Sequence, residues 1–328
     1  MSNILEIKDL YVQYQTDENV VHALNGFTLA LEKGETLGLV GETGAGKTTM
    51  ALSILQLLPE GVGKISAGAI QYNDLDIMKA SKHDLRKIRG SEISMIFQDP
   101  MTSLNPIMSV GDQVMEVLHL HYPDMSKEQR SRRVDEILTL VGIQPQRKDQ
   151  FPHQFSGGMR QRIVIAMALV AEPKLILADE PTTALDVTIQ AQILELMKAL
   201  KKEYDSAMIF ITHDLGIVAE FCDNVAVVYG GEVVERGTVE QVFARTTNHP
   251  YTRSLFECIP DLTSNVKRLL HSDSTMLDPT NLPEGCKFAS RCSGCMELCQ
   301  HQNPQPSMVE AGHMIKCHLF RKEGSGQP

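Results

Sequence analysis

Residues 36–48 read TLGLVGETGAGKT, an apolar run that passes directly into a glycine-rich turn. The apolar run predicts a buried β-strand, and the segment 48–58 after the turn predicts a helix. The turn itself, residues 41–48, matches the phosphate-binding pattern G-x-x-x-x-G-K-[ST] at every fixed position. Backbone N–H groups of such a turn close around phosphates, and the helix adds the positive end of its dipole. We therefore expect Lys47 to contact the β- and γ-phosphates of a nucleotide and Thr48 to ligate Mg²⁺.

A second apolar segment ends in two acidic residues. Residues 175–180 read LILADE, which predicts a buried strand with carboxylates at its end. We expect Asp179 to hold Mg²⁺ through water and Glu180 to polarise an attacking water molecule. Such strand ends are common when they occur alone, but together with the phosphate-binding turn this one indicates a nucleoside triphosphatase.

The chain alternates predicted strands with predicted helices. Further strands are expected at 5–14, 27–31, 208–211 and 225–229, and further helices at 110–120, 127–141, 163–170 and 188–204. This alternation favours a parallel sheet covered by helices, so we expect an α/β fold. The helices between residues 109 and 142 form a helical insertion between the β-containing parts.

Composition narrows the class of protein. The 328 residues are 42% hydrophobic and 22% charged, which is typical of a soluble globular protein. This length suffices for one large domain with an extra module, or for two ordinary domains. The net charge of −10 argues against binding of nucleic acid by bulk charge. No signal peptide is visible, and the longest apolar run, 163–171, is far shorter than the roughly 20 residues that cross a bilayer. If the protein serves a membrane, we expect it to dock on a partner that spans it.

Residues 155–162 read FSGGMRQR and open an apolar helix. This segment resembles the signature motif of ABC ATPases. It departs from the commonest form at Phe155 and Met159, and Met at the latter position is familiar in the peptide-transporter branch. Ser156 is a capping residue for a helix whose free N–H groups suit a γ-phosphate. The resemblance implies a P-loop NTPase of the ABC type, with a RecA-like core, a mixed β subdomain and a helical subdomain at about 100–170.

Further ABC motifs follow in the expected order, and the resemblance covers residues 4–255. Gln98 resembles the Q-loop glutamine, which senses Mg²⁺ and water while its loop contacts the membrane subunit. Residues 184–186 resemble the D-loop, and His213 resembles the switch histidine that contacts the γ-phosphate. A lone histidine is usually structural, but its order and spacing here favour the functional role.

The resemblance assigns individual residues to bound ATP. Tyr14 resembles the aromatic residue that stacks on adenine, with Tyr11 close by as the other candidate. Catalysis is assigned to Glu180, His213, Gln98 and Lys47, and Mg²⁺ binding to Thr48, Gln98 and Asp179. The other nucleotide contacts are assigned to Gly41, Glu42, Thr43, Gly44, Ala45, Gly46 and Thr49, and to the signature residues Ser156, Gly157 and Gly158.

The family geometry implies a dimer of nucleotide-binding domains. The signature residues of one subunit act on the ATP of its partner, so two ATP molecules lie between two domains arranged head to tail. Closing and opening of that dimer drives the membrane helices. Because every motif residue is present, including Glu180, we expect this chain to hydrolyse ATP.

The C-terminal tail indicates which branch of the ABC ATPases the chain resembles. Residues 249–252 read HPYT, and with the late cysteines they resemble the dipeptide/oligopeptide/nickel family of import ATPases, in its D-type subunit. The implied partners are a related F-type ATPase subunit, two transmembrane permease subunits, and an extracellular or periplasmic substrate-binding protein. The chain would then be peripheral, on the cytoplasmic face of the membrane. We expect an ABC domain at 1–255 and a Cys-rich extension at 256–328.

Five of the seven cysteines lie between residues 286 and 317. In a chain without an export signal, this indicates a metal site before it indicates disulfides. The cysteines that match the family tail are Cys286, Cys292, Cys299 and Cys317, and the family associates that pattern with a [4Fe–4S] cluster.

The residues themselves leave the metal open. Four thiolates fit Zn²⁺ as well as an iron–sulfur cluster, and Cys292 and Cys295 form the close pair that is frequent in zinc sites. Absence of a metal is the third possibility. Cys222 and Cys258, outside the cluster, are expected to be buried and inert.

The main functional prediction is import of small peptides powered by ATP. Uptake of nickel or a metal chelate is the alternative, because the motor motifs do not touch the cargo. A soluble ABC ATPase of DNA repair or translation is disfavoured by the single signature motif and by the acidic charge. A kinase or GTPase would leave the motif at residues 156–158 unexplained.

Overall fold

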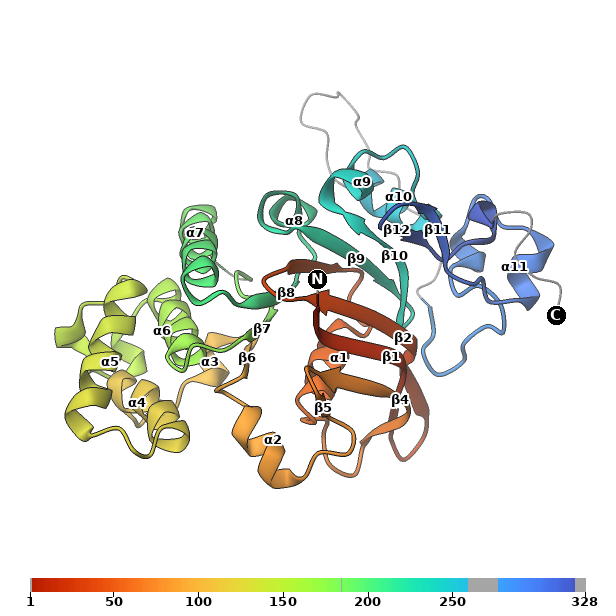
Figure 1. The fold of residues 1–328 in the computed structure, drawn as a ribbon. Helices are drawn as coiled ribbons and strands as arrows, with labels where there is room; N and C mark the ends of the chain where they lie inside the picture. The colour runs from red at the N-terminus through yellow and green to blue at the C-terminus, as the bar shows by residue number, and fades with distance from the viewer. Residues whose placement is uncertain (1, 184, 259–276, 322–328) are drawn as a thin grey trace. The chain divides into compact units, whose positions relative to one another are not determined.

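The computed structural model describes residues 2–183, 185–258 and 277–321 (Figure 1). These residues divide into two compact units. The first unit consists mainly of Asn73–Ile211. The second contains Leu5–Ala30, Leu37–Tyr72 and the described chain from Thr212 onward. We describe each unit by itself.

Three parallel strands form the centre of the first unit. β6 (Ile93–Ile96), β7 (Leu175–Asp179) and β8 (Ala207–Ile211) lie side by side in that order. All five residues of β7 and all five of β8 are buried, which explains why these strands read as unbroken apolar runs. The strand β5 (Leu75–Asp76) and the helix α2 (Lys82–Ile88) precede them in the chain.

The other elements of this unit are helical. They are α3 (Pro100–Ser103), α4 (Val110–His121), α5 (Lys127–Leu140), η1 (Pro145–Arg147), η2 (Pro152–Gln154), α6 (Gly157–Leu169) and α7 (Val187–Tyr204). α4, α5 and α6 pack against one another, as Figure 1 shows. The helices expected from the sequence are present, but α6 begins at Gly157 rather than at 163, so the signature motif forms its first turns.

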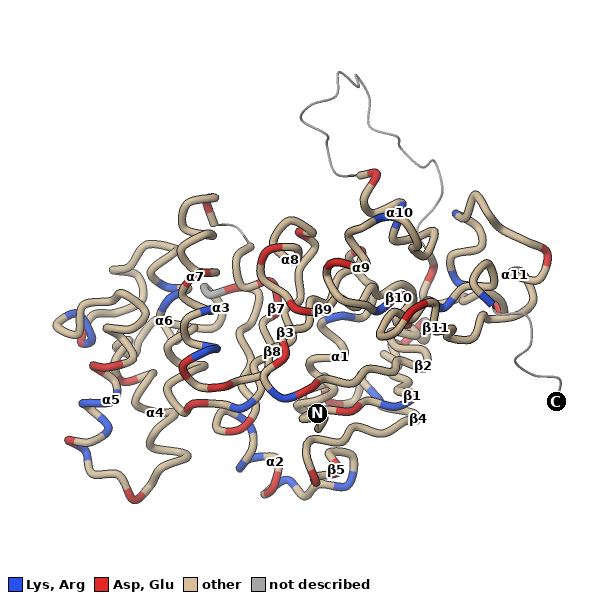
Figure 2. The backbone as a smooth tube through the Cα atoms, turned by 45° about the horizontal axis from the view of Figure 1, so that its top comes forward, with Lys and Arg blue, Asp and Glu red and all other residues tan. Residues whose placement is uncertain are grey.

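Local signals explain where these helices begin. The hydroxyl of Ser109 accepts the N–H of Asp112 at the start of α4. At the start of α5, Ser126 and Gln129 form a reciprocal capping box. α5 carries both acidic and basic residues (Figure 2), and Arg133 pairs with Glu136 and with Glu172 beyond the helix.

The second unit combines two sets of strands. β1 (Asn3–Gln15) lies between β2 (Val20–Glu32) and β4 (Gly63–Tyr72), antiparallel to β4. The other set contains β3 (Thr36–Val40), β9 (Asn224–Tyr229) and β10 (Glu232–Thr238), which lie side by side in that order. β3 is parallel to β9, whereas β9 and β10 are antiparallel. The sequence did not predict β4 or β10, and β2 is longer than expected.

The tail joins this unit through a strand pair. β11 (Ser307–Glu310) and β12 (His313–Ile315) form a hairpin, and β12 adds to the edge of β10, with Met314 opposite Arg236. The remaining elements are α1 (Lys47–Ile54), α8 (Leu215–Phe221), α9 (Val239–Phe243), α10 (Pro250–Glu257), η3 (Ala289–Arg291), α11 (Glu297–His301) and η4 (His318–Phe320).

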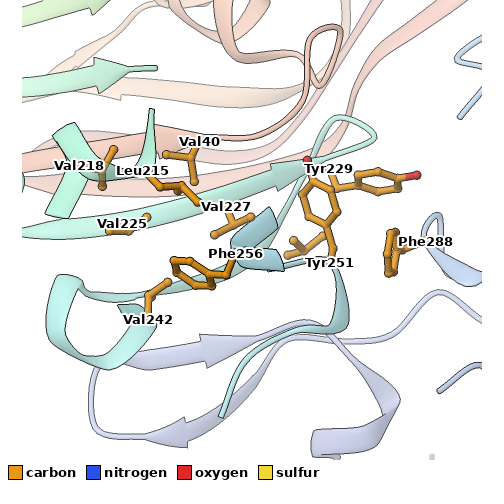
Figure 3. Packing of buried hydrophobic residues seen from close by; sticks show 11 residues of the cluster. Val40, Leu215, Val218, Val225, Val227, Tyr229, Val242, Tyr251, Phe256 and Phe288 are labelled. Carbon is orange, nitrogen blue, oxygen red and sulfur yellow. The ribbon is translucent and has the colours of Figure 1, made fainter. Parts of the chain in front are cut away.

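One apolar cluster ties the tail to the strands. Tyr229 of β9, Tyr251 of α10 and Phe288 of the tail pack with ring centroids 4.5 to 5.4 Å apart (Figure 3). Val40, at the end of β3, belongs to the same cluster. The strand that leads into the phosphate-binding turn is therefore packed on the same core as the Cys-rich tail.

Candidate nucleotide-binding site

The phosphate-binding turn lies between β3 and α1, as the sequence predicts. All five residues of β3 are buried, and α1 begins at Lys47. Gly46 has φ of 103°, and a Cβ there would lie 2.6 Å from the carbonyl oxygen of Ala23. Because both the backbone angle and the space require glycine, a larger residue at position 46 would displace the turn.

Lys47 is buried against the turn. Its Nζ donates to the carbonyl oxygens of Gly41, at 2.7 Å, and Glu42, at 3.0 Å. This position holds the ammonium within the turn where phosphates would be bound. Thr48, the predicted Mg²⁺ ligand, is exposed at the next position.

The two candidate adenine-stacking residues differ in their surroundings. The hydroxyl of Tyr14 lies 3.1 Å from Oγ1 of Thr49 on α1, and its side chain is half-buried. Tyr11 is 42% exposed, and its hydroxyl lies 3.1 Å from where a Cβ on Gly26 of β2 would stand. The contact with the helix therefore belongs to Tyr14.

His213 belongs to the second unit as well. It is exposed, between β8 and the first turn of α8. The next residue, Asp214, caps α8 by accepting the N–H groups of Gly216 and Ile217. This cap fixes the backbone on one side of the histidine.

The acidic residues lie in the first unit, at the end of β7. Asp179 is the buried last residue of the strand. Oε2 of Glu180 accepts from Nε2 of Gln98 and from Oγ1 of Thr183, each at 2.9 Å. The structure thus brings together Glu180 and Gln98, 82 positions apart in the sequence. The sequence did not identify Thr183, since a threonine three residues after the acid carries no motif of its own.

Glu180 also has an unusual backbone. Its φ is 46°, in the left-handed region, and its N–H donates to the carbonyl oxygen of Ile211 at 2.9 Å. A non-glycine residue in that region costs on the order of 1 kcal/mol or more and persists where the surroundings fix it. The two side-chain donors and this backbone bond fix the direction of the carboxylate.

The signature motif forms the exposed beginning of α6. Oγ of Ser156 caps the helix by accepting the N–H of Met159 at 3.4 Å, and both Ser156 and Gly157 are exposed. A Cβ on Gly158 would lie 2.6 Å from Ile189 of α7, so the third motif position is constrained by packing. Of the motif residues at the start of α6, Ser156 and Gly157 are therefore the ones most accessible from solvent.

Both departures from the commonest signature have a physical role. The guanidinium of Arg147 stacks on the ring of Phe155 at 4.3 Å and contacts the sulfur of Met159 at 3.6 Å. Of the D-loop residues, Asp186 caps α7 by accepting the N–H of Ile189 at 2.9 Å, whereas Ala184 lies outside the described residues.

The tail cysteines gather near one another without forming a ligand set. Cys299 and Cys317 are buried, Cys286 and Cys292 are half-buried, and Cys295 is exposed. Burial raises the pKa of Cys286 to about 11, and charge on Cys317, Cys299 or Cys292 acts in the same direction.

Across the described parts of the chain, no three His, Cys, Asp or Glu side chains are arranged to hold a metal ion. The structure therefore gives no support to the predicted [4Fe–4S] or zinc site, although the four thiols have the donor chemistry that either group needs. The expectation for the two remaining cysteines needs correction: Cys222 is half-buried rather than buried, and Cys258 is exposed at the end of α10.

None of the described helices combines the length and the apolar character that a bilayer crossing requires.

The phosphate-binding turn, the strand ending in Asp179 and the capped signature helix define a nucleotide-binding domain of the ABC class. The family model "ABC transporter" matches residues 24–183, and the model "Oligopeptide/dipeptide transporter, C-terminal region" matches residues 234–299. The second match spans the start of the Cys-rich tail, including Cys286, Cys292 and Cys299.

Curated relatives resemble the chain over nearly its whole length. The oligopeptide transport ATP-binding protein OppD of Bacillus subtilis is 48% identical over 98% of this chain and 90% of its own. The dipeptide transport ATP-binding protein DppD of the same species is 46% identical, over 97% of this chain and 95% of its own. OppD of Escherichia coli is also 46% identical, over 92% and 89%. The chain therefore belongs to the ABC transporter family, in the branch of oligopeptide and dipeptide ATP-binding subunits.

Solved structures agree with the fold. The ATP-binding cassette MJ0796, in a dimeric post-hydrolysis state with ADP and Pi, is 30% identical with a TM-score of 0.65, over 72% of this chain and 98% of its own. CbiO1 of Clostridium perfringens, part of an ABC transporter complex, is 32% identical with a TM-score of 0.64, over 75% and 92%.

Proposed function

We propose that this chain binds and hydrolyses ATP and thereby powers a membrane ABC importer of di- and oligopeptides. The observation that carries the proposal is the similarity to peptide-transport ATP-binding proteins along 97–98% of the chain, tail included. That similarity favours peptides over the alternative cargo, nickel or a metal chelate.

The residues of the site suit ATP hydrolysis. Lys47, now bonded to two carbonyl groups of the turn, is the cation that would bind the β- and γ-phosphates. Thr48, Gln98 and Asp179 supply the hydroxyl, amide and carboxylate oxygens that Mg²⁺ prefers. Bound Mg²⁺ would neutralise charge on the phosphate oxygens. Glu180, held in one direction by Gln98 and Thr183, would orient and polarise the attacking water, and His213 would contact the γ-phosphate.

The exposed signature turn supports a partnership with a second ATPase subunit. The N–H groups at the start of α6 suit a γ-phosphate, and Ser156, Gly157 and Gly158 would act on the ATP of that partner. The similar cassette MJ0796 is a dimer in its post-hydrolysis state. We propose that the partner is a related F-type chain.

A pocket beside Gln98 is the proposed docking place for a permease subunit. It has a volume of about 440 Å³ and is lined by the mainly apolar residues Met95, Phe97, Val117, Val164 and Met167. Phe97, directly before Gln98, is 42% exposed. An apolar helix or loop of the membrane subunit in this pocket would couple its motion to the Gln98 loop. Such docking, with a substrate-binding protein outside, would place the chain on the cytoplasmic face of the membrane.

We also propose that residues 1–255 form the ABC domain and that residues 256–328 form the C-terminal extension.

Within this extension, we propose that Cys286, Cys292, Cys299 and Cys317 bind a [4Fe–4S] cluster. The donor set supports the cluster, and a cluster would cross-link the tail. Anaerobic purification with iron, sulfide and zinc analysis tests it, beside Cys286→Ser and Cys317→Ser. About four irons per chain, lost in both variants, are expected; stoichiometric zinc or no metal contradicts the cluster.

The function is tested on the assembled transporter purified from membranes. Its ATPase activity should rise when a peptide-loaded substrate-binding protein is added, and Glu180→Gln in this chain should remove the rise. Stimulation by nickel and not by peptide would support the alternative cargo. Copurification with ribosomes or DNA in place of membrane subunits would support a soluble ABC ATPase.

A further inference from the structure

We propose that Arg291 of the Cys-rich tail is a positioning residue for the phosphate-binding turn and acts through Glu42. The inference rests on the proposed function only in that the turn binds ATP. It concerns two side chains 249 positions apart, both within the second unit.

The two side chains form a paired contact. Nη1 of Arg291 donates to Oε2 of Glu42, and Nη2 donates to Oε1, each at 2.8 Å. The side chain of Arg291 is 12% exposed and that of Glu42 is 26% exposed. Bidentate pairs fix orientation as well as distance, and this one is shielded from much of the solvent.

Glu42 is held at every polar group. Its N–H donates to the hydroxyl of Tyr251 at 2.8 Å, and its carbonyl oxygen accepts from Nζ of Lys47 at 3.0 Å. Arg291 holds the carboxylate, the third group. Glu42 thus links the tail to the lysine that would bind phosphate, so the position of Arg291 bears on the geometry of the turn.

The guanidinium of Arg291 itself packs against two aromatic rings. It lies 5.6 Å from the centre of Phe288 and 5.8 Å from that of Tyr229. Those rings pack with Tyr251, the residue that also binds the backbone of Glu42 (Figure 3). A rigid aromatic group therefore supports both the guanidinium and the hydroxyl that hold Glu42.

A second stretch of the tail, at Leu277 and Pro279, also lies beside the phosphate-binding turn. Glu42, Thr43 and Gly44 line a cavity of about 190 Å³ together with Leu277 and Pro279 of the tail. The N–H of His22 on β2 donates to the carbonyl oxygen of Pro279 at 2.9 Å, which fixes that stretch of the tail.

The charge of Glu42 explains why the pair matters. A triphosphate is a polyanion, and a carboxylate within its binding turn repels it unless a cation compensates the charge. Arg291 is that cation. Without it, Glu42 is left partly buried and uncompensated, and the turn loses a fixed point. The effect should therefore increase with the number of phosphates on the ligand.

The test measures nucleotide affinity in the full chain by competition against a fluorescent ATP analogue with Mg²⁺. Arg291→Met should weaken ATP binding about tenfold and leave adenosine binding unchanged. Glu42→Gln removes the repulsive charge, so the double variant Glu42→Gln/Arg291→Met should bind ATP nearly as well as the unmodified chain. In the transporter, Arg291→Met should raise KM for ATP more than it lowers kcat.

Lys316→Met is the matched control. Lys316 belongs to the tail, is 13% exposed and pairs at 2.6 Å with Glu232 of β10, which is not a residue of the phosphate-binding turn. It should leave ATP affinity unchanged. The inference is overturned if Arg291→Met binds ATP normally, if the double variant is no better than Arg291→Met, or if Lys316→Met has the same effect. If the unmodified chain binds no ATP, the proposed function fails and the inference fails with it.

Discussion

At the scale of single residues, the carboxylate of Glu180 is the best-defined chemical group of the site. Two neutral donors, Gln98 and Thr183, hold the same oxygen, and the backbone is fixed at a positive φ. None of these contacts can be read from the pattern LILADE, because Gln98 is distant in sequence and Thr183 belongs to no motif. The sequence predicts which acid is present, whereas its fixed direction follows from packing.

Glu180→Gln should therefore abolish turnover without abolishing binding. The amide keeps the size of the side chain but cannot accept a proton, and general-base catalysis contributes about 10²–10⁴-fold to rate. We expect ATP hydrolysis by the assembled transporter to fall at least ~100-fold. ATP affinity, measured by filter binding, should stay within about threefold of the unmodified chain. Equal loss of binding would contradict the assigned role.

His249 makes stability depend on pH. Burial lowers the pKa of this histidine to about 4, and the nearby Glu235 carboxylate opposes that shift. Its Nδ1 accepts the N–H of Tyr251 at 3.0 Å at the start of α10. Above pH 6.5 the ring is neutral in both states; as pH falls toward 4, only the unfolded chain takes up the proton. Up to about 3 kcal/mol of stability should therefore be lost across that window.

The change His249→Asn tests this dependence. Asn keeps a capping acceptor at the start of the helix but does not titrate. In urea unfolding followed by circular dichroism, the free-energy difference between the unmodified chain and the variant should shrink as pH falls from 6.5 to 4. A difference that is constant with pH would mean that His249 does not cause the loss.

At the scale of elements, the sequence predicted most of the parts that carry the site. Unbroken apolar runs identified β3, β7 and β8, and serine caps agree with the starts of α4 and α5. Among the strands that the sequence did not predict are two with mixed patterns: five of the ten residues of β4 are exposed, and β10 contains buried Glu232 and Glu235. Those acids are buried because tail residues pair with them, and a local pattern cannot reveal such partners.

The pocket beside α4 gives a prediction at this scale. Val117→Arg places a long charged side chain in the pocket proposed for the permease, so it should reduce recovery of the chain with membranes several-fold. Glu116→Arg adds the same side chain at the exposed neighbouring position and should not. ATP affinity of both purified variants should be unchanged. Equal recovery of both variants with membranes would exclude the pocket as the docking place.

The helix α6, which begins with the signature motif, gives a further prediction at the scale of elements. Ser156→Arg blocks the exposed start of α6 with a bulky side chain, but it does not touch the phosphate-binding turn of the same chain. We expect this variant to bind ATP normally as an isolated chain. In the assembled transporter it should reduce hydrolysis at least ~10-fold, because the partner's ATP site loses its signature residues. Normal hydrolysis by the assembled variant would argue against a shared site.

At the scale of the whole molecule, the chain joins a nucleotide-binding domain to a tail that its sequence alone described only as Cys-rich. The tail adds a hairpin to β10 and a guanidinium to the phosphate-binding turn. The contact between Arg291 and Glu42 could not be predicted, since neither residue belongs to a fixed motif position. The nucleotide-binding domain and the tail together form one ATPase subunit that hydrolyses ATP for peptide import.

The most direct test of that account is uptake of a radiolabelled tripeptide by cells of the source organism that lack this gene. Reintroducing the unmodified chain should restore uptake, Glu180→Gln should not, and nickel uptake should be the same in all three strains. Peptide uptake that persists without the gene or returns with Glu180→Gln, or loss of nickel uptake instead, would contradict the account.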